Sequence, residues 1–192
     1  MVDEVESLRD AGLQAAVREH LRGLPPGSGP ESLSEIVVDK ATVLNGIERF
    51  HGLRQIGLEG TDVADLRPLA GLRDIEELWL SDTRVTDLRA LSGLQSLTVL
   101  ELGDTPVVDI EPLRPLHRLE KLWLNGTKVT DLEPVRSLER LVTVGVAGAP
   151  IGDYSPLEEL NDLQVLVVSR SASAHLMALA HRADLAIHFL DE

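Results

Sequence analysis

Apolar residues recur along the chain with a 22-residue period. The column that defines the register consists of Leu53, Ile75, Leu97, Leu119, Leu141, Leu163 and Leu185. Further apolar residues follow three and five positions later in each unit, with His188 as the exception. Regular spacing of this kind is typical of repeat proteins, in which one unit buries too little surface to fold alone. We therefore expect about seven stacked units.

Each unit predicts two kinds of local structure. In segments such as 75–80, apolar and variable residues alternate with a period of about two, which indicates a half-buried strand. In segments such as 65–72 and 131–138, an Asp precedes a Pro and apolar residues spaced by about one helical turn, which predicts a short helical or 3₁₀ turn. The fold class that follows is an α/β solenoid, with a parallel sheet on the concave side and short turns on the convex side.

Both ends of the chain depart from this pattern. Residues 2–22 predict a helix, and a Gly- and Pro-rich run at 23–30 ends it. We expect residues 1–30 to form a helical N-terminal cap with a linker, and residues 31–192 to form the solenoid, which begins with a shortened 20-residue unit. From about residue 163 the pattern decays, and Arg182 replaces a Leu. Segment 176–180 predicts a longer helix before a final strand at 185–190, and together they form a C-terminal cap.

The repeat openings Ile75-Glu-Glu-Leu-Trp-Leu80 and Leu119-Glu-Lys-Leu-Trp-Leu124 resemble those of leucine-rich repeats of the internalin-like, 22-residue class, and the resemblance covers about residues 33–190. That class carries Asn at the ninth position, where this chain has Thr61, Thr83, Thr105 and Thr127, then Ala149 and Ser171. We expect the hydroxyl ladder to bond neighbouring backbone as the amides do, with a looser turn at Ala149. The sequence also resembles the repeat tails of bacterial NACHT-type ATPases, which implies a sensor arm.

Composition narrows the range of partners. The formal charge of −14, from 32 acidic and 18 basic residues, would repel a phosphate backbone, so we expect no nucleic-acid partner. The chain has no cysteine, which removes disulfides and thiolate chemistry and favours a reducing compartment. The N-terminus is acidic where a signal peptide would be basic, and no segment approaches the roughly 20 apolar residues of a membrane span. We therefore expect a cytoplasmic protein.

No constellation for catalysis or metal binding stands out. The regular carboxylates Asp65, Asp87, Asp109, Asp131 and Asp153 each precede a helical turn, so we interpret them as caps for backbone N–H groups. Hard cations would need several oxygens converging on one point. The C-terminal histidines, His175, His181 and His188, match no common ligand spacing, and no phosphate loop or nucleophile elbow is present. We expect no enzymatic activity, no metal and no cofactor.

Outward-facing strand positions are the candidate binding surface. Both tryptophans, Trp79 and Trp123, fall at the fifth position of units two apart, so they should lie about 10 Å from each other, with Glu101 and Val99 between them. The charged surround consists of Glu76, Glu77, Glu120 and Lys121. Since Trp is enriched at binding hot spots and carboxylates select cations, this face predicts a protein-binding module, with a basic partner favoured. The alternative is that the rings only cover neighbouring aliphatic side chains.

Two features of the same face leave alternatives open. Gly57 and Gly145 flank the tryptophans and would leave the sheet bare for a partner's backbone, or else mark local bends. A second, apolar patch is expected from Val165, Val167, Ile187 and Phe189. The chain's own last residues, a second copy or a further domain would cover it. The alternative functions are therefore a sensor or autoinhibitory arm of a larger NACHT-type ATPase, and a structural homodimer.

Overall fold

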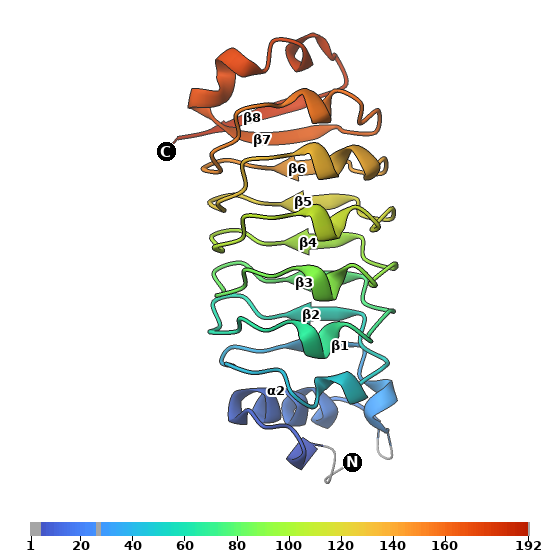
Figure 1. Ribbon diagram of the computed structural model, residues 1–192. Helices are drawn as coiled ribbons and strands as arrows, with labels where there is room; N and C mark the ends of the chain where they lie inside the picture. Colours follow the sequence, from blue (N-terminus) through green and yellow to red (C-terminus); the bar gives the residue numbers. More distant parts are fainter. Residues whose placement is uncertain (1–4, 26–27, 192) are drawn as a thin grey trace.

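Eight short parallel strands stack in chain order into one sheet, as the computed structural model shows (Figure 1). The strands are β1 (Glu35–Val37), β2 (Gln55–Gly57), β3 (Glu77–Trp79), β4 (Val99–Glu101), β5 (Lys121–Trp123), β6 (Thr143–Gly145), β7 (Val165–Ser169) and β8 (Ala186–Leu190). The structure describes residues 5–25 and 28–191. Residues 2–4 of the predicted N-terminal helix, residues 26–27 of the predicted linker and Glu192 of the predicted solenoid lie outside the described residues.

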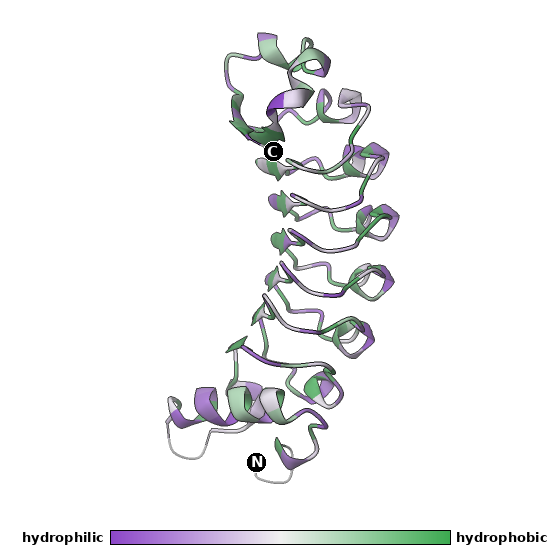
Figure 2. Cartoon of the chain, turned by 90° about the vertical axis from the view of Figure 1, so that its left-hand side faces the viewer, coloured by the Kyte–Doolittle hydropathy of each residue, from purple (hydrophilic) through white to green (hydrophobic). Residues whose placement is uncertain are grey.

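Short 3₁₀ turns run along the side opposite the strands (Figure 2). In the repeated units they are η2 (Ile47–Arg49), η3 (Arg67–Leu69), η4 (Arg89–Leu91), η5 (Glu111–Leu113), η6 (Glu133–Ser137) and η7 (Ser155–Leu157). Three more 3₁₀ turns lie toward the two ends of the chain, and they are η1 (Pro30–Ser32), η8 (Arg170–His175) and η9 (Leu179–His181). Five of all these turns, η1, η3, η5, η6 and η7, carry Pro at the first or second position, where the missing N–H costs nothing. The predicted solenoid, with a parallel sheet and short turns, is confirmed.

The core is a column of aliphatic side chains between the sheet and the turns. Leu53, Leu97 and Leu141 of the defining column are fully buried, as are the strand centres such as Leu100 and Leu122. Burial of one leucine side chain contributes about 1.5–3 kcal/mol, which a single unit gains only when its neighbours cover it on both sides.

A left-handed backbone position follows each central strand. It is occupied by Gly60, Asp82, Asp104, Gly126 and Gly148, with φ between 55° and 75°. This conformation turns the chain from the sheet onto the flank of the solenoid, and Gly and Asp are among the residues that tolerate it. The backbone N–H at four of the positions donates to a carbonyl of the next unit, at 2.7–2.9 Å. At Gly148 the acceptor is instead the Ser169 hydroxyl, at 2.7 Å.

The threonine ladder is buried, but it bonds within each unit. The hydroxyl group of each ladder threonine donates to the carbonyl three residues earlier, at 2.6–2.7 Å, in Thr61, Thr83, Thr105 and Thr127. The expected bonds to neighbouring units are therefore replaced by bonds that close the turn locally, because a hydroxyl is shorter than an amide side chain. At Ala149 only the backbone bond to the Val146 carbonyl remains, at 3.1 Å.

The predicted continuous helix over residues 2–22 is wrong over residues 7–10, which interrupt it. The helix that follows the break is α2 (Ala11–Arg22), and residues 7–10 before it are not helical. The reason is Asp10, whose carboxylate accepts the N–H groups of Gly12 and Leu13 and so starts α2 as its N-cap. Leu13 and Val17 of α2 are buried, as the apolar face predicted. The unit that follows α2 is shorter than the interior units. Glu35 of β1 pairs with Gln55 of β2, whereas Gln55 pairs with Glu77 of β3 across a longer stretch of chain.

The last unit slips by one residue. Val165 of β7 pairs with Ala186, an offset of 21, whereas the pairs from β2 to β7 are all offset by 22. As a result Ile187 pairs with the fully buried Leu166, and His188 moves to the exposed concave side opposite Val167. The apparent exception at His188 in the apolar column is therefore only a change of register.

The slip overturns the predicted apolar patch of Val165, Val167, Ile187 and Phe189. Ile187 and Phe189 pair with Leu166 and Val168 and so face the core side of the sheet, while Ala186 and His188 lie beside the two valines. Phe189 is nevertheless 40% exposed, since it belongs to the last strand.

The predicted helix over 176–180 is also wrong. Residues 176–178 separate η8 from η9 and are not helical. Arg182, which replaces the Leu of the repeat, donates from its guanidinium to the carbonyls of Leu160, Asn161 and Leu163 at 2.7–3.1 Å. It therefore caps backbone groups of the preceding unit where a leucine would only have packed against them.

Candidate functional site

The candidate site on the concave sheet is a row of three residues on three neighbouring strands. Trp79 of β3 pairs with Glu101 of β4, and Glu101 pairs with Trp123 of β5. All three side chains are half-buried, and so is Val99 beside Glu101. Because strands in a sheet lie about 4.8 Å apart, the row places the backbones of the two tryptophans about 10 Å from each other, with the strand that carries Glu101 between them.

The Trp123 ring lies over the backbone of Gly145. A Cβ atom added at Gly145 would come within 2.3 Å of Trp123 Cε3, so the glycine makes room for the ring. Gly57 is covered in a similar way, since a Cβ there would meet the Val37 side chain at 3.4 Å. Both glycines are buried, and the interpretation that they leave the sheet bare for a partner's backbone is wrong. The consequence is a Trp123 ring held in place before any partner binds.

The Glu101 carboxylate is electrostatically strained at this position. Burial raises its pKa above the usual 4.5, repulsion by the Glu59 carboxylate raises the pKa further, and attraction to Lys121 acts in the opposite direction. A cation placed beside Glu101 would relieve both the lost hydration and the repulsion. The row is therefore suited to a positively charged group.

The charged surround of the row is only partly available. Glu76 pairs with Arg54, and Glu77 accepts a hydrogen bond from the Gln55 side chain at 3.3 Å. Glu120 and Lys121 are exposed. The acidic residues that sequence reasoning placed around the tryptophans are thus brought together, but the Glu76 carboxylate is already paired with Arg54.

The recurring aspartates hold the turns. Asp65, Asp87, Asp109, Asp131 and Asp153 each accept the backbone N–H of the residue two positions later, at 2.7–3.0 Å. Asp87 also pairs with Arg89, and the hydrogen bonds from this side chain and its backbone lower the pKa of Asp87 to about 2. The aspartates thus bind backbone N–H groups as expected, but each does so from the position before the N-cap residue, whose own side chain makes no capping bond. Among residues 5–25 and 28–191, no group of three His, Asp or Glu side chains is placed to hold a metal ion.

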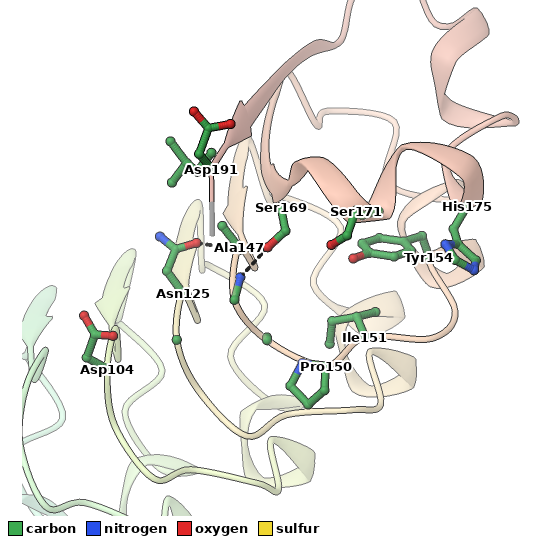
Figure 3. A pocket seen from close by; sticks show the side chains of 15 residues that line it. Asp104, Asn125, Ala147, Pro150, Ile151, Tyr154, Ser169, Ser171, His175 and Asp191 are labelled. Carbon is green, nitrogen blue, oxygen red and sulfur yellow. Dashed lines mark hydrogen bonds between the residues drawn. The ribbon is translucent and has the colours of Figure 1, made fainter.

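A pocket of about 750 Å³, which sequence reasoning did not find, lies at the carboxyl ends of the later strands (Figure 3). Its lining includes Asp104, Asn125, Ala147, Tyr154, Ser169 and His175. The hollow arises where the threonine ladder stops, because Ala147, Gly148 and Ala149 have little or no side chain to fill the space. The run Ala147-Gly-Ala-Pro150 was the available sequence signal.

Comparison with known proteins agrees with the repeat pattern of the central units. A model described as leucine-rich repeats in two copies matches residues 74–115 and 95–140. The chain has the fold of leucine-rich repeat proteins. No curated protein matches it in sequence.

The repeat protein is similar in structure to internalins of Listeria monocytogenes. For one internalin (inlF) the TM-score is 0.85 at 24% identity, over 98% of this chain and 58% of that one. For internalin C2 (inlC2) the TM-score is 0.83 at 25% identity, over 96% of this chain and 84% of that one. A leucine-rich repeat protein of Leptospira interrogans matches with a TM-score of 0.65 at 18% identity, over 83% of this chain and 49% of that one. At these identities the likeness establishes the fold, and the chain spans less than two thirds of the first internalin.

Leucine-rich repeat domains typically bind proteins and are usually non-catalytic. A search of the described residues for helices of membrane-spanning length and hydropathy finds none. The general expectation of a binding domain therefore fits the family, and the particular surface has to be argued from the side chains.

Proposed function

We propose that this protein binds a basic segment of a protein partner on its concave sheet, with Trp79 and Trp123 as anchors and Glu101 as the charge that selects the partner. The observation that carries the proposal is the row itself, in which half-buried Trp79 and Trp123 lie on the two strands beside half-buried Glu101. Indole rings offer a large apolar area at little entropic cost, and tryptophan is over-represented among residues that dominate interface energies.

Rigidity of the site favours this function. Trp123 packs over Gly145, and each of the three strands is fixed by parallel pairing on both sides. A preformed site avoids the ordering cost that a flexible surface pays on association. The alternative, that the rings only cover neighbouring side chains, accounts for Trp123 over Gly145 but not for the desolvated Glu101 carboxylate.

The charge of the protein supports a basic partner. A net charge of −14 attracts cationic segments over a long range and raises their association rate at low salt. The absence of cysteine supports the cytoplasm as the proposed compartment.

Two other functions depended on the C-terminal apolar patch. Because Ile187 and Phe189 face the core side of the sheet, that patch does not form as predicted. Neither the docking arm of a larger ATPase nor the structural homodimer is therefore proposed.

The test is affinity capture from a lysate of the source organism with three versions of the protein. They are the wild type, the Trp79→Ala/Trp123→Ala variant, and a Val108→Ala control, since Val108 is 57% exposed and lies outside the sheet. Circular dichroism first establishes that all three are folded. We expect a protein retained by the wild type and the control, lost with the double variant, and released by added salt. Retention of the same proteins by all three would contradict the proposal.

A further inference from the structure

The pocket beside the concave face is a built site rather than an irregularity of the surface. It opens next to the carboxyl ends of β5, β6 and β7 (Figure 3), and its lining includes the small residues Ala147, Gly148 and Ala149. Two of its polar side chains are held by the backbone. Asn125 Oδ1 accepts the Ala147 N–H at 2.8 Å, and Ser169 Oγ accepts the Gly148 N–H at 2.7 Å. These bonds fix the shape of the pocket.

Tyr154 supplies a buried polar group without a partner. The residue is only 5% exposed, and its hydroxyl makes no hydrogen bond with any residue that the structure describes. No buried side-chain oxygen in the described residues is both unpartnered and sealed from solvent, so the hydroxyl opens to the pocket that Tyr154 lines. Burial also raises the pKa of Tyr154, which keeps the phenol protonated. A ligand that hydrogen-bonds here would satisfy a group that is costly to leave unpaired.

Asp104 supplies an unpaired charge at the other end of the pocket. Its carboxylate leans over Gly126, where an added Cβ would lie 2.2 Å from Oδ1. Within residues 5–25 and 28–191 the Asp104 carboxylate makes no ion pair, whereas Asp191, the other acid in the lining, is paired with Arg170 at 2.9 Å. The described lining contains no Lys or Arg. The pocket therefore presents one free negative charge.

The walls between these two groups are largely apolar. Ala147, Ala149, Pro150 and Ile151 line the same space. A matching ligand has a positive charge at one end for Asp104, a slender apolar stem, and a polar group at the other end for the Tyr154 hydroxyl. An arginine residue has all three, because its guanidinium and its backbone amide groups lie at opposite ends of a methylene chain. The planar guanidinium fork also matches a carboxylate, whereas lysine carries its charge at a single point.

We propose that this pocket receives an arginine side chain of the protein partner, with Asp104 binding the guanidinium and Tyr154 binding a backbone amide group at the other end of the side chain. The proposal rests on the proposed function only in naming a protein as the source of the side chain. It adds a second contact on the flank of the solenoid, next to the concave sheet on which the tryptophans lie.

The experiment is a titration followed by two-dimensional ¹H–¹⁵N NMR. The probe is N-acetyl-arginine amide, which presents the side chain as a peptide would, and the matched control is the neutral isostere N-acetyl-citrulline amide. Concentrations reach about 20 mM, since one side chain gives a dissociation constant on the order of 1 mM. We expect saturable shifts of the Gly126, Gly148 and Ser169 amides with the arginine probe and much weaker ones with citrulline. The N-acetyl-lysine probe is expected to bind more weakly than arginine.

Variants at matched positions complete the test. Asp104→Asn is expected to raise the dissociation constant about tenfold, and Tyr154→Phe about threefold. Asp82→Asn is the control, because Asp82 occupies the same turn position one unit earlier, with φ of 56° against 55° at Asp104, and the change alters the net charge equally. Asn tolerates this left-handed conformation, so both variants should fold.

Several results would overturn the proposal. They are equal binding of the arginine and citrulline probes, equal effects of Asp104→Asn and Asp82→Asn, shifts that lie outside the pocket, or no shifts at all. Tighter binding of free L-arginine than of the blocked probe would indicate an amino-acid site and would equally refute a partner side chain. The Trp79→Ala/Trp123→Ala variant should bind the probe like the wild type, so failure here is distinguishable from failure of the concave-face proposal.

Discussion

Asp10 ties the N-terminal helix α2 to the first unit of the solenoid, and its replacement by alanine tests that role. The carboxylate accepts the N–H groups of Gly12 and Leu13 at 2.8 and 3.0 Å. It also accepts the N–H and hydroxyl of Thr42 at 2.9 and 3.1 Å and the N–H of Val43 at 3.4 Å. One side chain therefore caps the helix and joins it to a loop 32 residues away.

The expected loss for Asp10→Ala follows from these contacts. Removal of an N-cap costs about 1 kcal/mol. The bonds to the loop add about 1–2 kcal/mol in total, after a discount for their partial exposure to solvent. The sum of about 2–3 kcal/mol corresponds to a fall in melting temperature of about 4–12 °C for a chain of this size.

The loss should depend on pH. Burial acts to raise the pKa of Asp10, but the hydrogen bonds from Thr42, Leu13 and Val43 outweigh it and lower the pKa below the usual 3.8. Because the folded pKa is lowered, the stabilisation is present above the ordinary pKa and is lost as the pH falls through the folded value. The difference between wild type and variant should therefore shrink as the pH falls below the ordinary value of 3.8.

Urea unfolding followed by far-ultraviolet circular dichroism measures the effect at pH 7 and at pH 2.5. Asp109→Ala is the control, because the Asp109 carboxylate accepts only the Glu111 N–H, at 2.8 Å, and its loss should cost no more than about 1 kcal/mol. Equal losses for the two variants, or a loss at Asp10 that is the same at both pH values, would refute the reasoning.

Three further substitutions test other contacts. Arg182→Ala removes the donors to three backbone carbonyls and should destabilise the C-terminal units by about 1–3 kcal/mol in urea unfolding; an unchanged midpoint would contradict the capping role. In the wild type, ionisation of Glu101 should change the tryptophan fluorescence above pH 4.5, and Glu101→Gln should abolish that change. Since the pKa of Glu101 is raised in the folded protein, its ionisation lowers the stability of the fold as the pH rises. Gly145→Ala should displace the Trp123 ring, change the near-ultraviolet circular dichroism and cost about 1–3 kcal/mol, whereas Gly57→Ala, with its nearest contact at 3.4 Å, should cost less; equal effects would contradict the packing.

The central architecture could be predicted from the sequence because each unit repeats the same environment. Leu78, Leu100 and Leu122 occupy equivalent buried positions, so one period determines strand, register and core together. The ends could not be predicted in the same way. Before Ala11, an apolar pattern compatible with a helix is interrupted by a local cap at Asp10, and capping competes with helix continuation through side-chain contacts that periodicity does not encode.

The one-residue change of register at β8 could not be predicted, because its apolar residues fit either register. Leu185 keeps the 22-residue spacing, and its N–H donates to the Arg182 carbonyl as that of Leu163 does to Leu160. Ile187 and Phe189 are apolar whichever face they take, so the pattern did not distinguish the registers. A polar residue in an apolar column, at His188, was the one indication of the shorter unit.

The candidate site was predictable in position but not in detail. The alternation of residues along each strand placed Trp79, Glu101 and Trp123 on one face of the sheet, because the backbone of a strand directs successive side chains to opposite faces. The position of the Trp123 ring over Gly145 depends on side-chain packing, which the pattern of residues does not encode. The pocket exists because several residues have small side chains, and a search of the sequence for functional groups overlooks such positions. Cytoplasmic location stays a prediction, since the fold carries no information on compartment.

The constant offset between paired strands from β2 to β7 has an architectural consequence. Interior units are interchangeable in register, so excision of residues 97–118 should let β3 pair directly with β5. That deletion would bring Trp79 and Trp123 onto adjacent strands, about 5 Å apart instead of about 10 Å. The distance between the two anchors is thus a count of inserted units, which gene duplication or protein engineering can change in whole steps. The shorter units at the two ends lack this freedom.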